Sequence, residues 1–229
     1  MFKLNKLHLF ILLVTIAAIG CKKNESDDNF PRNVDIYMRY LLEGNQFNGL
    51  AKVSDADTIA IGEPDTATYF FTINGKDMKQ VISPGGIKNY SVKANMPFSD
   101  QYEVKIKGPD HSITTKSTKI IPIDSFQLPR AISKSTALNI EYFGSPLNAN
   151  ESIIAMLVAS DGKTASATLN GPASSKSINI KADKLSELIS GLADIYLIRT
   201  YSDEDVTGKL HFFIKNEFYS RTKQVELTD

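Results

Sequence analysis

The chain has 229 residues, of which 26 are basic and 26 are acidic, so its formal net charge is zero. Balanced charge argues against a polyanionic partner such as nucleic acid, and 42% hydrophobic residues exclude wholesale disorder. The single cysteine excludes an internal disulfide framework and any cysteine-rich metal site. Two domains of roughly 100 residues each are expected at this length.

The first twenty residues differ in composition from the rest of the chain. Lys3 and Lys6 precede an apolar run that extends from Leu7 to Gly20. As a helix this run would be roughly 21 Å long, which is shorter than the hydrocarbon core of about 30 Å. The pattern therefore predicts a signal peptide over residues 1–20 rather than a membrane-spanning helix.

The only cysteine directly follows this run. Ala18-Ile19-Gly20-Cys21 resembles a lipobox, in which the thiol is diacylated and the bond before the cysteine is cleaved. The resemblance implies lipid attachment at Cys21, which would hold the protein on a membrane without spanning it. The alternative is an ordinary secretory signal with an incidental cysteine. Residues 21–32 are mostly polar and are expected to form a flexible tether.

The start of the mature chain suggests a location. Cys21 is followed by Lys22-Lys23 and then by acidic residues, a start that resembles lipoproteins of the Bacteroidota. In that group a charged stretch after the cysteine is associated with export to the outer face, although here the lysines precede the acids. The resemblance implies a lipid anchor at the outer membrane, with the cell surface favoured over a periplasm-facing position.

From Val34 onward the dominant pattern is alternation of apolar and polar residues, which predicts strands with one buried face. Asn74-Gly75 ends one such run and predicts a tight hairpin, because both turn positions require positive φ. About six or seven such runs, spaced by turn residues, predict an N-terminal β-sandwich over residues 33–123. Pro122 and Pro129 then indicate an inter-domain linker, placed at residues 124–135.

The second half repeats this plan with a different sequence. Ile132-Ser133-Lys134-Ser135, which leads into Leu138-Asn139-Ile140, and the helical spacing from Asp183 to Gly191 are similar to immunoglobulin-like domains of many Bacteroidota lipoproteins. The resemblance implies an immunoglobulin-like β-sandwich over residues 136–229, in which Tyr196 would fix a corner between strands. Asp183 is expected to cap the short helix and Gly191 to end it. The predicted fold class is all-β, with two tandem immunoglobulin-like or fibronectin-like β-sandwiches.

The titratable residues form no catalytic pattern. Beyond the signal peptide only His111 and His211 remain, and the sequence has no Gly-x-Ser-x-Gly motif and no glycine-rich phosphate loop. We therefore expect no enzyme activity, no catalytic residue, no cofactor and no metal centre. Two acidic clusters, at 55–65 and 203–205, are expected to be solvated loops, with calcium binding as the less favoured alternative.

Two kinds of surface residue stand out as candidate sites. Asp57-Thr58-Ile59 and Asp65-Thr66-Ala67 look like the three-residue O-glycosylation signal of exported Bacteroidota proteins, which makes Thr58 and Thr66 candidate acceptors. Four aromatic residues fall on strand faces opposite the expected core: Tyr37, Phe70, Phe143 and Phe213. Phe143 and Phe213 are the candidate ligand contacts, and a domain–domain contact or scattered surface aromatics are the alternatives.

These observations favour a membrane-anchored, non-enzymatic envelope lipoprotein that acts as a binding or scaffold module. Its partner would be a glycan or an envelope protein, reached while a lipid anchor holds the chain on the membrane. The alternative is a structural fibre or adhesin subunit that assembles through edge strands.

Overall fold

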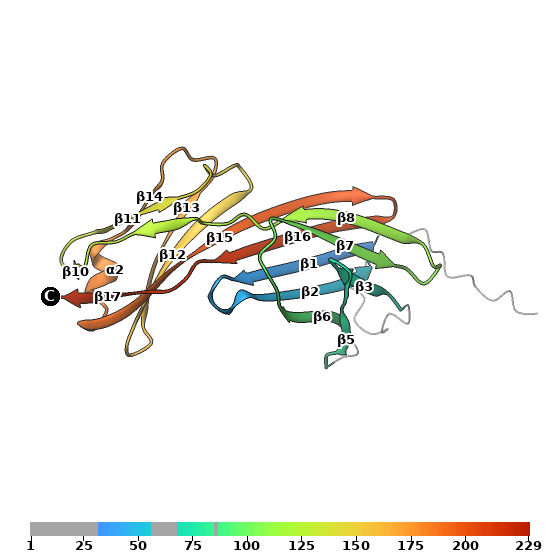
Figure 1. The fold of residues 1–229 in the computed structure, drawn as a ribbon, viewed down its shortest axis with the longest axis horizontal. Helices are drawn as coiled ribbons and strands as arrows, with labels where there is room; N and C mark the ends of the chain where they lie inside the picture. The colour runs from blue at the N-terminus through green and yellow to red at the C-terminus, as the bar shows by residue number, and fades with distance from the viewer. Residues whose placement is uncertain (1–31, 56–67, 85–86) are drawn as a thin grey trace, which may run out of the picture.

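The computed structural model describes residues 32–55, 68–84 and 87–229. In these residues the chain is nearly all strand, which confirms the predicted all-β class. Figure 1 shows two layered bodies arranged end to end along the long axis of the molecule. No helix in this part of the chain is long and apolar enough to cross a membrane.

The first half of the described chain contains eight strands and one 3-10 turn: β1 (Arg32–Leu41), η1 (Glu43–Asn45), β2 (Gln46–Asp55), β3 (Phe70–Ile73), β4 (Lys76–Asp77), β5 (Lys79–Ile82), β6 (Lys88–Asn95), β7 (Gln101–Lys107) and β8 (Ile113–Lys119). The second half contains nine strands and one short helix: β9 (Ser125–Gln127), β10 (Ala131–Ser133), β11 (Leu138–Phe143), β12 (Glu151–Ala159), β13 (Thr164–Asn170), β14 (Ser177–Ile180), α2 (Ala182–Ser186), β15 (Gly191–Thr207), β16 (Leu210–Tyr219) and β17 (Lys223–Thr228).

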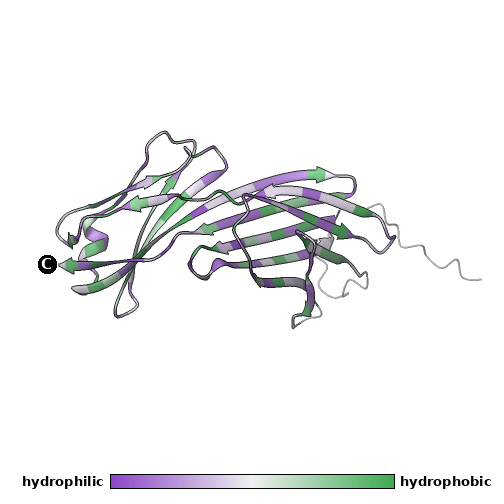
Figure 2. Cartoon of the chain, viewed as in Figure 1, coloured by the Kyte–Doolittle hydropathy of each residue, from purple (hydrophilic) through white to green (hydrophobic). Residues whose placement is uncertain are grey.

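The N-terminal body is a sandwich of two sheets. One sheet has the strand order β5-β6-β2-β1-β16-β15, and the other has the order β4-β3-β7-β8. Alternate residues of β1 point between the sheets, as the sequence pattern predicts, and Figure 2 shows this alternation as changing colour along the strands. The core of this body is formed mainly by apolar residues of β1, β3, β7 and β16: Val34, Ile36, Met38, Tyr40, Phe71, Ile73, Tyr102, Val104, Ile106, Phe212, Ile214 and Phe218.

The C-terminal body is a second sandwich. Strands β10, β17, β15, β12 and β13 form one layer, and the small sheet β14-β11-β9 forms the other. Strand β12 has alternating fully buried and half-buried residues, which fits a strand near the middle of its sheet. Leu185 of α2 is buried in this core.

The 17-residue strand β15 belongs to both bodies. Its beginning pairs with β17 and β12, whereas Ile198–Thr207 pairs with β16. Strand β16 then pairs in parallel with all ten residues of β1. The sheet of the N-terminal body therefore contains two strands from the last quarter of the chain, and the predicted division into 33–123 and 136–229 does not follow the observed sheets.

The predicted linker also contains strands. Within residues 124–135, β9 pairs with β11 and β10 pairs in parallel with β17. Phe126 and Ile132 of these strands are buried in the core. Two prolines are compatible with such short edge strands, so this segment is part of the C-terminal sandwich.

Two local predictions at the helix differ from the structure. The position before α2 is Lys181, no side chain caps the helix, and Asp183 lies inside it. Gly191 has a φ of 125° and begins β15, so it does not end the helix.

Tyr196 lies in the interior of β15 and stacks on Tyr219, so it fixes no corner. By contrast, Asn74 and Gly75 both have positive φ, as the predicted hairpin requires.

Candidate ligand-binding groove

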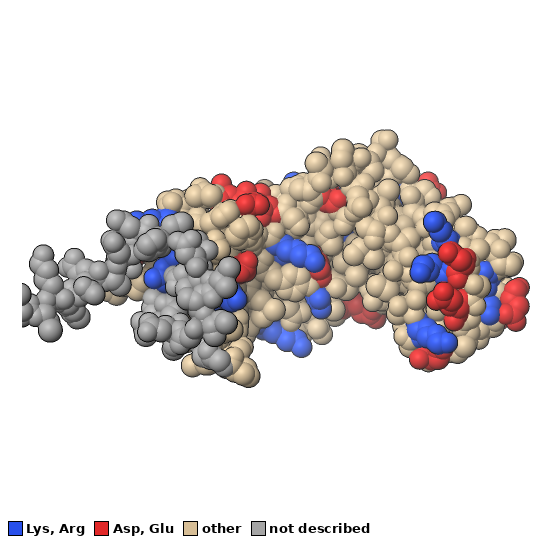
Figure 3. Space-filling model, turned by 180° about the vertical axis from the view of Figure 1, so that it is seen from behind, with Lys and Arg blue, Asp and Glu red and all other residues tan. Residues whose placement is uncertain are grey.

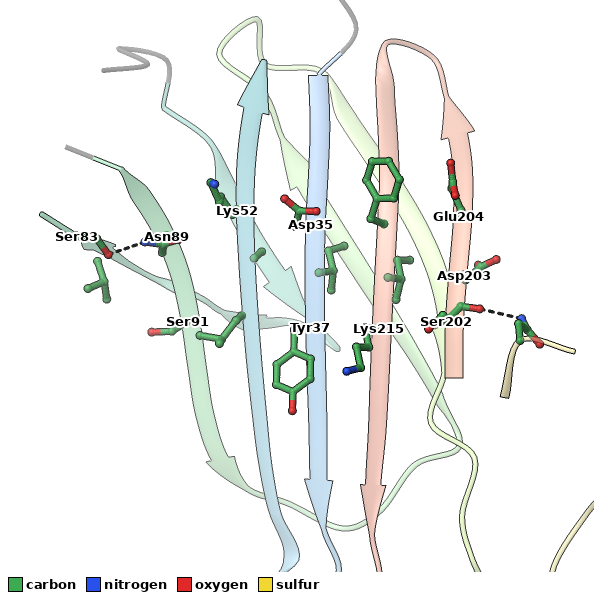
Figure 4. A pocket seen from close by; sticks show the side chains of 17 residues that line it. Asp35, Tyr37, Lys52, Ser83, Asn89, Ser91, Ser202, Asp203, Glu204 and Lys215 are labelled. Carbon is green, nitrogen blue, oxygen red and sulfur yellow. Dashed lines mark hydrogen bonds between the residues drawn. The ribbon is translucent and has the colours of Figure 1, made fainter. Parts of the chain in front are cut away.

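A groove of about 980 Å³ lies on the outer face of the N-terminal sheet. Because Val34 and Ile36 of β1 face the core, the alternate residues Asp35 and Tyr37 face outward into this groove. Figure 4 shows side chains from β1, β2, β6, β15 and β16 on the same face of the sheet. A concave site of this size is in the range of small-ligand pockets.

Strand register places the groove residues in two rows across the sheet. In the first row Asp35 lies between Lys52 of β2 and Phe213 of β16. In the second row Tyr37 lies between Leu50 and Lys215. Outward residues at paired positions are close neighbours on one face of a sheet, so residues that are far apart in the sequence form one surface.

Several polar groups in the groove are unpaired. Within the described residues, the side chains of Asp35, Lys52 and Ser91 make no hydrogen bond or ion pair. At one end Asn89 donates a hydrogen bond to Ser83 over 2.7 Å. At the other end the Asn150 side chain donates to the carbonyl oxygen of Ser202 over 2.8 Å. Figure 4 shows both bonds as dashed lines, and the unpaired groups between them are available to a ligand.

A hydrogen-bonded cluster borders the groove beside Tyr37. The hydroxyls of Tyr37 and Tyr219 both donate to Oε2 of Glu217, and Arg39 donates from Nε to the Tyr37 hydroxyl over 2.9 Å. The Lys215 ammonium lies 3.3 Å from Oε1 of the same carboxylate. The Arg39 guanidinium also lies over both tyrosine rings, 5.4 and 4.8 Å from their centroids. These contacts fix the orientation of the Tyr37 ring before any ligand arrives.

The same contacts shift the pKa values of the cluster. Burial alone would raise the pKa of Glu217, but hydrogen bonds from Tyr37 and Tyr219 outweigh burial and hold its pKa below the usual value. Burial, together with the nearby Glu217 carboxylate, raises the pKa of Tyr219 to about 12. The pKa of Tyr37 is raised for the same reasons. At neutral pH the cluster therefore contains an ionised Glu217 and two neutral tyrosines.

The candidate ligand contacts lie in different places. Phe213 lines the groove, whereas Phe143 is on β11 of the C-terminal body, and each is 37% exposed. Phe70 is on β3 of the opposite sheet and is 62% exposed. The structure thus brings Phe213 together with Tyr37 and separates it from the other two. Cys21, Thr58 and Thr66 lie outside the described residues.

The sequence pattern does not predict four of the groove residues as site residues: Asp35, Lys52, Ser91 and Lys215. Each occupies an outward position of an alternating run, so the alternation marks it as a surface residue. The alternation does not reveal which strands are neighbours, and this information was necessary to recognise the groove.

The acidic residues 203–205 are in strand β15, not in a loop as predicted. Their side chains alternate between the two faces of the sheet. Asp203 and Asp205 pair with Lys116 of the opposite sheet over 3.4 and 2.8 Å, and Glu204 pairs with His211 over 2.8 Å. Within the described residues no three histidine, cysteine or carboxylate side chains gather in a way that could hold a metal ion.

Comparisons with known proteins give only remote likenesses. No family model matches the chain, and no curated protein matches it. Among solved structures it is similar to a tetra-tandem repeat in the extending region of a large adhesion protein, at 12% identity and a TM-score of 0.28, over 86% of this chain and 49% of that chain. The chain thus spans about half the length of that structure.

Two further solved structures show a comparable likeness. One is Dpr2 Ig1-Ig2 in complex with DIP-Theta Ig1-Ig3, at 9% identity and a TM-score of 0.27, over 88% of this chain and 96% of that chain. The other is the Bacteroides ovatus mixed-linkage glucan utilization locus protein SGBP-B with a mixed-linkage heptasaccharide, at 12% identity and a TM-score of 0.18, over 77% and 52% of the two chains. These likenesses assign the chain to no family.

Proposed function

We propose that this protein is a non-enzymatic binding module that holds its ligand in the groove on the outer face of β6, β2, β1, β16 and β15. The observation that carries the proposal is the set of unpaired polar side chains, including Asp35, Lys52 and Ser91, around the exposed ring of Phe213. A concave site with apolar walls and a few convergent polar groups is typical of ligand binding. The groove residues within the described chain include no histidine and no cysteine, so binding is better supported than nucleophilic catalysis.

The groove can be tested without knowing the ligand. We expect a bulky maleimide–polyethylene glycol adduct on a Ser91→Cys variant to abolish binding, because Ser91 lines the groove. The same adduct on Ser174→Cys is the matched control, because Ser174 is exposed in the C-terminal body. Binding of the full acylated protein would be measured on a glycan array and on immobilised envelope proteins. Acylated Cys21 has no free thiol, so the maleimide reacts with the introduced cysteine.

Three results are informative. Binding that is lost only with the Ser91→Cys adduct supports the proposal. Binding that survives this adduct overturns the groove as the site. The absence of any ligand in both panels overturns the binding function as stated.

The second part of the proposal is the location of the module. We propose that the chain is lipid-anchored at the outer membrane through Cys21, with the cell surface favoured over the periplasm. This part is supported by the apolar run, the lipobox-like residues and the single cysteine. Two or more acyl chains give stable anchoring, because each buried methylene contributes about 0.8 kcal/mol.

Replacing Cys21 with serine is expected to move the protein from the membrane fraction to the soluble fraction. The reason is that serine has no thiol to which the lipid can be attached. Fractionation and metabolic labelling with radioactive palmitate would measure both effects, with Ser26→Ala as a control outside the lipobox. Retention of label and membrane association in the Cys21→Ser variant would contradict the anchor.

The alternative role as a fibre subunit would require a strand that can be exchanged between molecules. The first strand is a poor candidate because β1 is paired along its full length with β2 on one side and β16 on the other. Displacing β1 would break both ladders and remove Val34, Ile36 and Met38 from the core.

A further inference from the structure

We propose that the ligand of the groove is a neutral oligosaccharide chain that lies across the strands from β6 to β15. This inference rests on the proposed binding function and adds the chemical class of the ligand. It follows from the charges of the groove, its aromatic rings, its paired backbone and its length.

The charges in the groove favour a neutral ligand. Asp35 lies directly opposite Lys52 on the neighbouring strand. Glu204 of β15 is a diagonal neighbour of Lys215 on β16. An anion would be attracted by the lysines but repelled by the carboxylates, and a cation would meet the reverse. Figure 3 shows the same mixture on one face of the whole molecule, where acidic and basic side chains are interspersed.

The unpaired groups exclude a purely apolar ligand. Covering the carboxylate of Asp35 or the ammonium of Lys52 with hydrocarbon would remove water without providing a hydrogen bond, which is costly. A sugar hydroxyl both donates and accepts hydrogen bonds, so a single ligand type can satisfy a carboxylate, an ammonium and the Ser91 hydroxyl. Hydroxyl groups along a chain would match the polar side chains that lie in both rows.

Two aromatic rings on this face, the exposed ring of Phe213 and the half-buried ring of Tyr37, favour a ligand that also has apolar faces. Tyr37 and Phe213 are diagonal neighbours, because Tyr37 is paired with Lys215 and Asp35 with Phe213. Neighbouring strands lie about 4.8 Å apart and every second residue of a strand lies about 6.6 Å along it, so these two positions are roughly 8 Å apart. Sugar rings present C–H groups on their faces and hydroxyls at their edges. Successive rings can therefore contact these aromatics while their hydroxyls reach the polar side chains beside them.

The paired backbone argues against an extended peptide. A peptide usually binds a sheet by adding a strand to a free edge, and the groove floor offers none, because β2, β1 and β16 each have partners on both sides. Over these three strands a ligand can contact only side chains. The distance from β6 to β15 is four inter-strand spacings, or roughly 19 Å, which is long enough for several sugar rings.

The test uses the full acylated protein in a detergent without a sugar headgroup, because such a headgroup would compete. The probes are neutral oligosaccharides, sulfated or uronic-acid oligosaccharides of the same length, and short peptides. We expect affinity for neutral oligosaccharides that changes little with salt, because screening weakens only charge–charge attraction. Phe213→Ala should weaken this binding by about tenfold or more, whereas Phe143→Ala, at an equally exposed ring, should leave it unchanged.

Two further variants test the polar side chains of the first row. Asp35→Asn and Lys52→Gln keep a similar size and should each weaken binding by roughly fivefold or more, since a charge-assisted hydrogen bond to the ligand is replaced by a weaker neutral one. Neutral binding that depends on Phe213, Asp35 and Lys52 supports the inference. Groove-dependent binding of charged glycans or peptides alone overturns the ligand class but keeps the proposed function. Binding that none of these substitutions weakens overturns both.

Discussion

A fragment of residues 33–123 is expected to be unfolded or aggregated when it is produced alone. In the full protein all of β1 pairs with β16, which comes from the last quarter of the chain. Without β16 the fragment would lose Phe212, Ile214 and Phe218 from its core and expose a ten-residue sheet edge. Replacing one large buried residue by alanine already costs about 3–5 kcal/mol, so losing three removes an amount comparable to the whole stability of a domain, about 5–15 kcal/mol.

The complementary fragment provides the control. Residues 124–229 contain every strand of the C-terminal sandwich, so this fragment is expected to fold, with the β15–β16 hairpin extending from it. Two-dimensional amide NMR would show dispersed signals for 124–229 and collapsed signals for 33–123. Mixing the two fragments should restore dispersed signals to the 33–123 fragment. Dispersed signals from 33–123 alone would contradict the shared sheet.

Replacing Arg199 with methionine is expected to destabilise the protein by about 3–5 kcal/mol. Arg199 is 2% exposed, and its guanidinium donates to Glu151 over 2.5 Å. It also donates to the carbonyl oxygens of Pro122, Ser145 and Pro146 over 3.0 to 3.3 Å. The variant would leave a buried carboxylate and three carbonyl groups without this donor, where the two bodies meet.

Urea unfolding at neutral pH would measure this loss. Arg221→Met is the matched control, because Arg221 is exposed and the same substitution there should change stability by less than about 0.5 kcal/mol. The double variant Arg199→Met with Glu151→Leu should regain part of the loss, because it removes the unpaired charge. Equal stabilities of the Arg199 and Arg221 variants would show that the buried pair does not hold the two bodies together.

The effect should also depend on pH, with a sign fixed by Glu151. Burial alone would raise the pKa of Glu151, but hydrogen bonds from Arg199 and Asn148 outweigh it, so its pKa lies below the usual value. A lowered pKa contributes stability above the unfolded value of about 4.3, and this contribution is lost as pH falls through the folded pKa. The gap between wild type and Arg199→Met should therefore shrink below about pH 4.3. A gap that stays constant would mean that the pair is not ionised.

The sequence alone determined the all-β class and the faces of individual strands. Alternation placed Val34, Ile36 and Met38 in the core and Tyr37 and Phe213 outside, because the side chains of a strand alternate with a period of two. Asn74-Gly75 marked its turn because positive φ is a local requirement. These features depend on neighbouring residues and so can be read directly from the chain.

Which strands are neighbours follows from the tertiary structure and not from the local sequence. The parallel pairing of β1 with β16 joins residues about 180 positions apart, and no local pattern distinguishes it from other pairings of similar strands. The same applies to Asp203 and Asp205, whose partner Lys116 lies on a strand of the other sheet. The groove exists because non-local pairing places Asp35, Lys52 and Phe213 side by side, and a binding surface of this kind is a property of the assembled sheet.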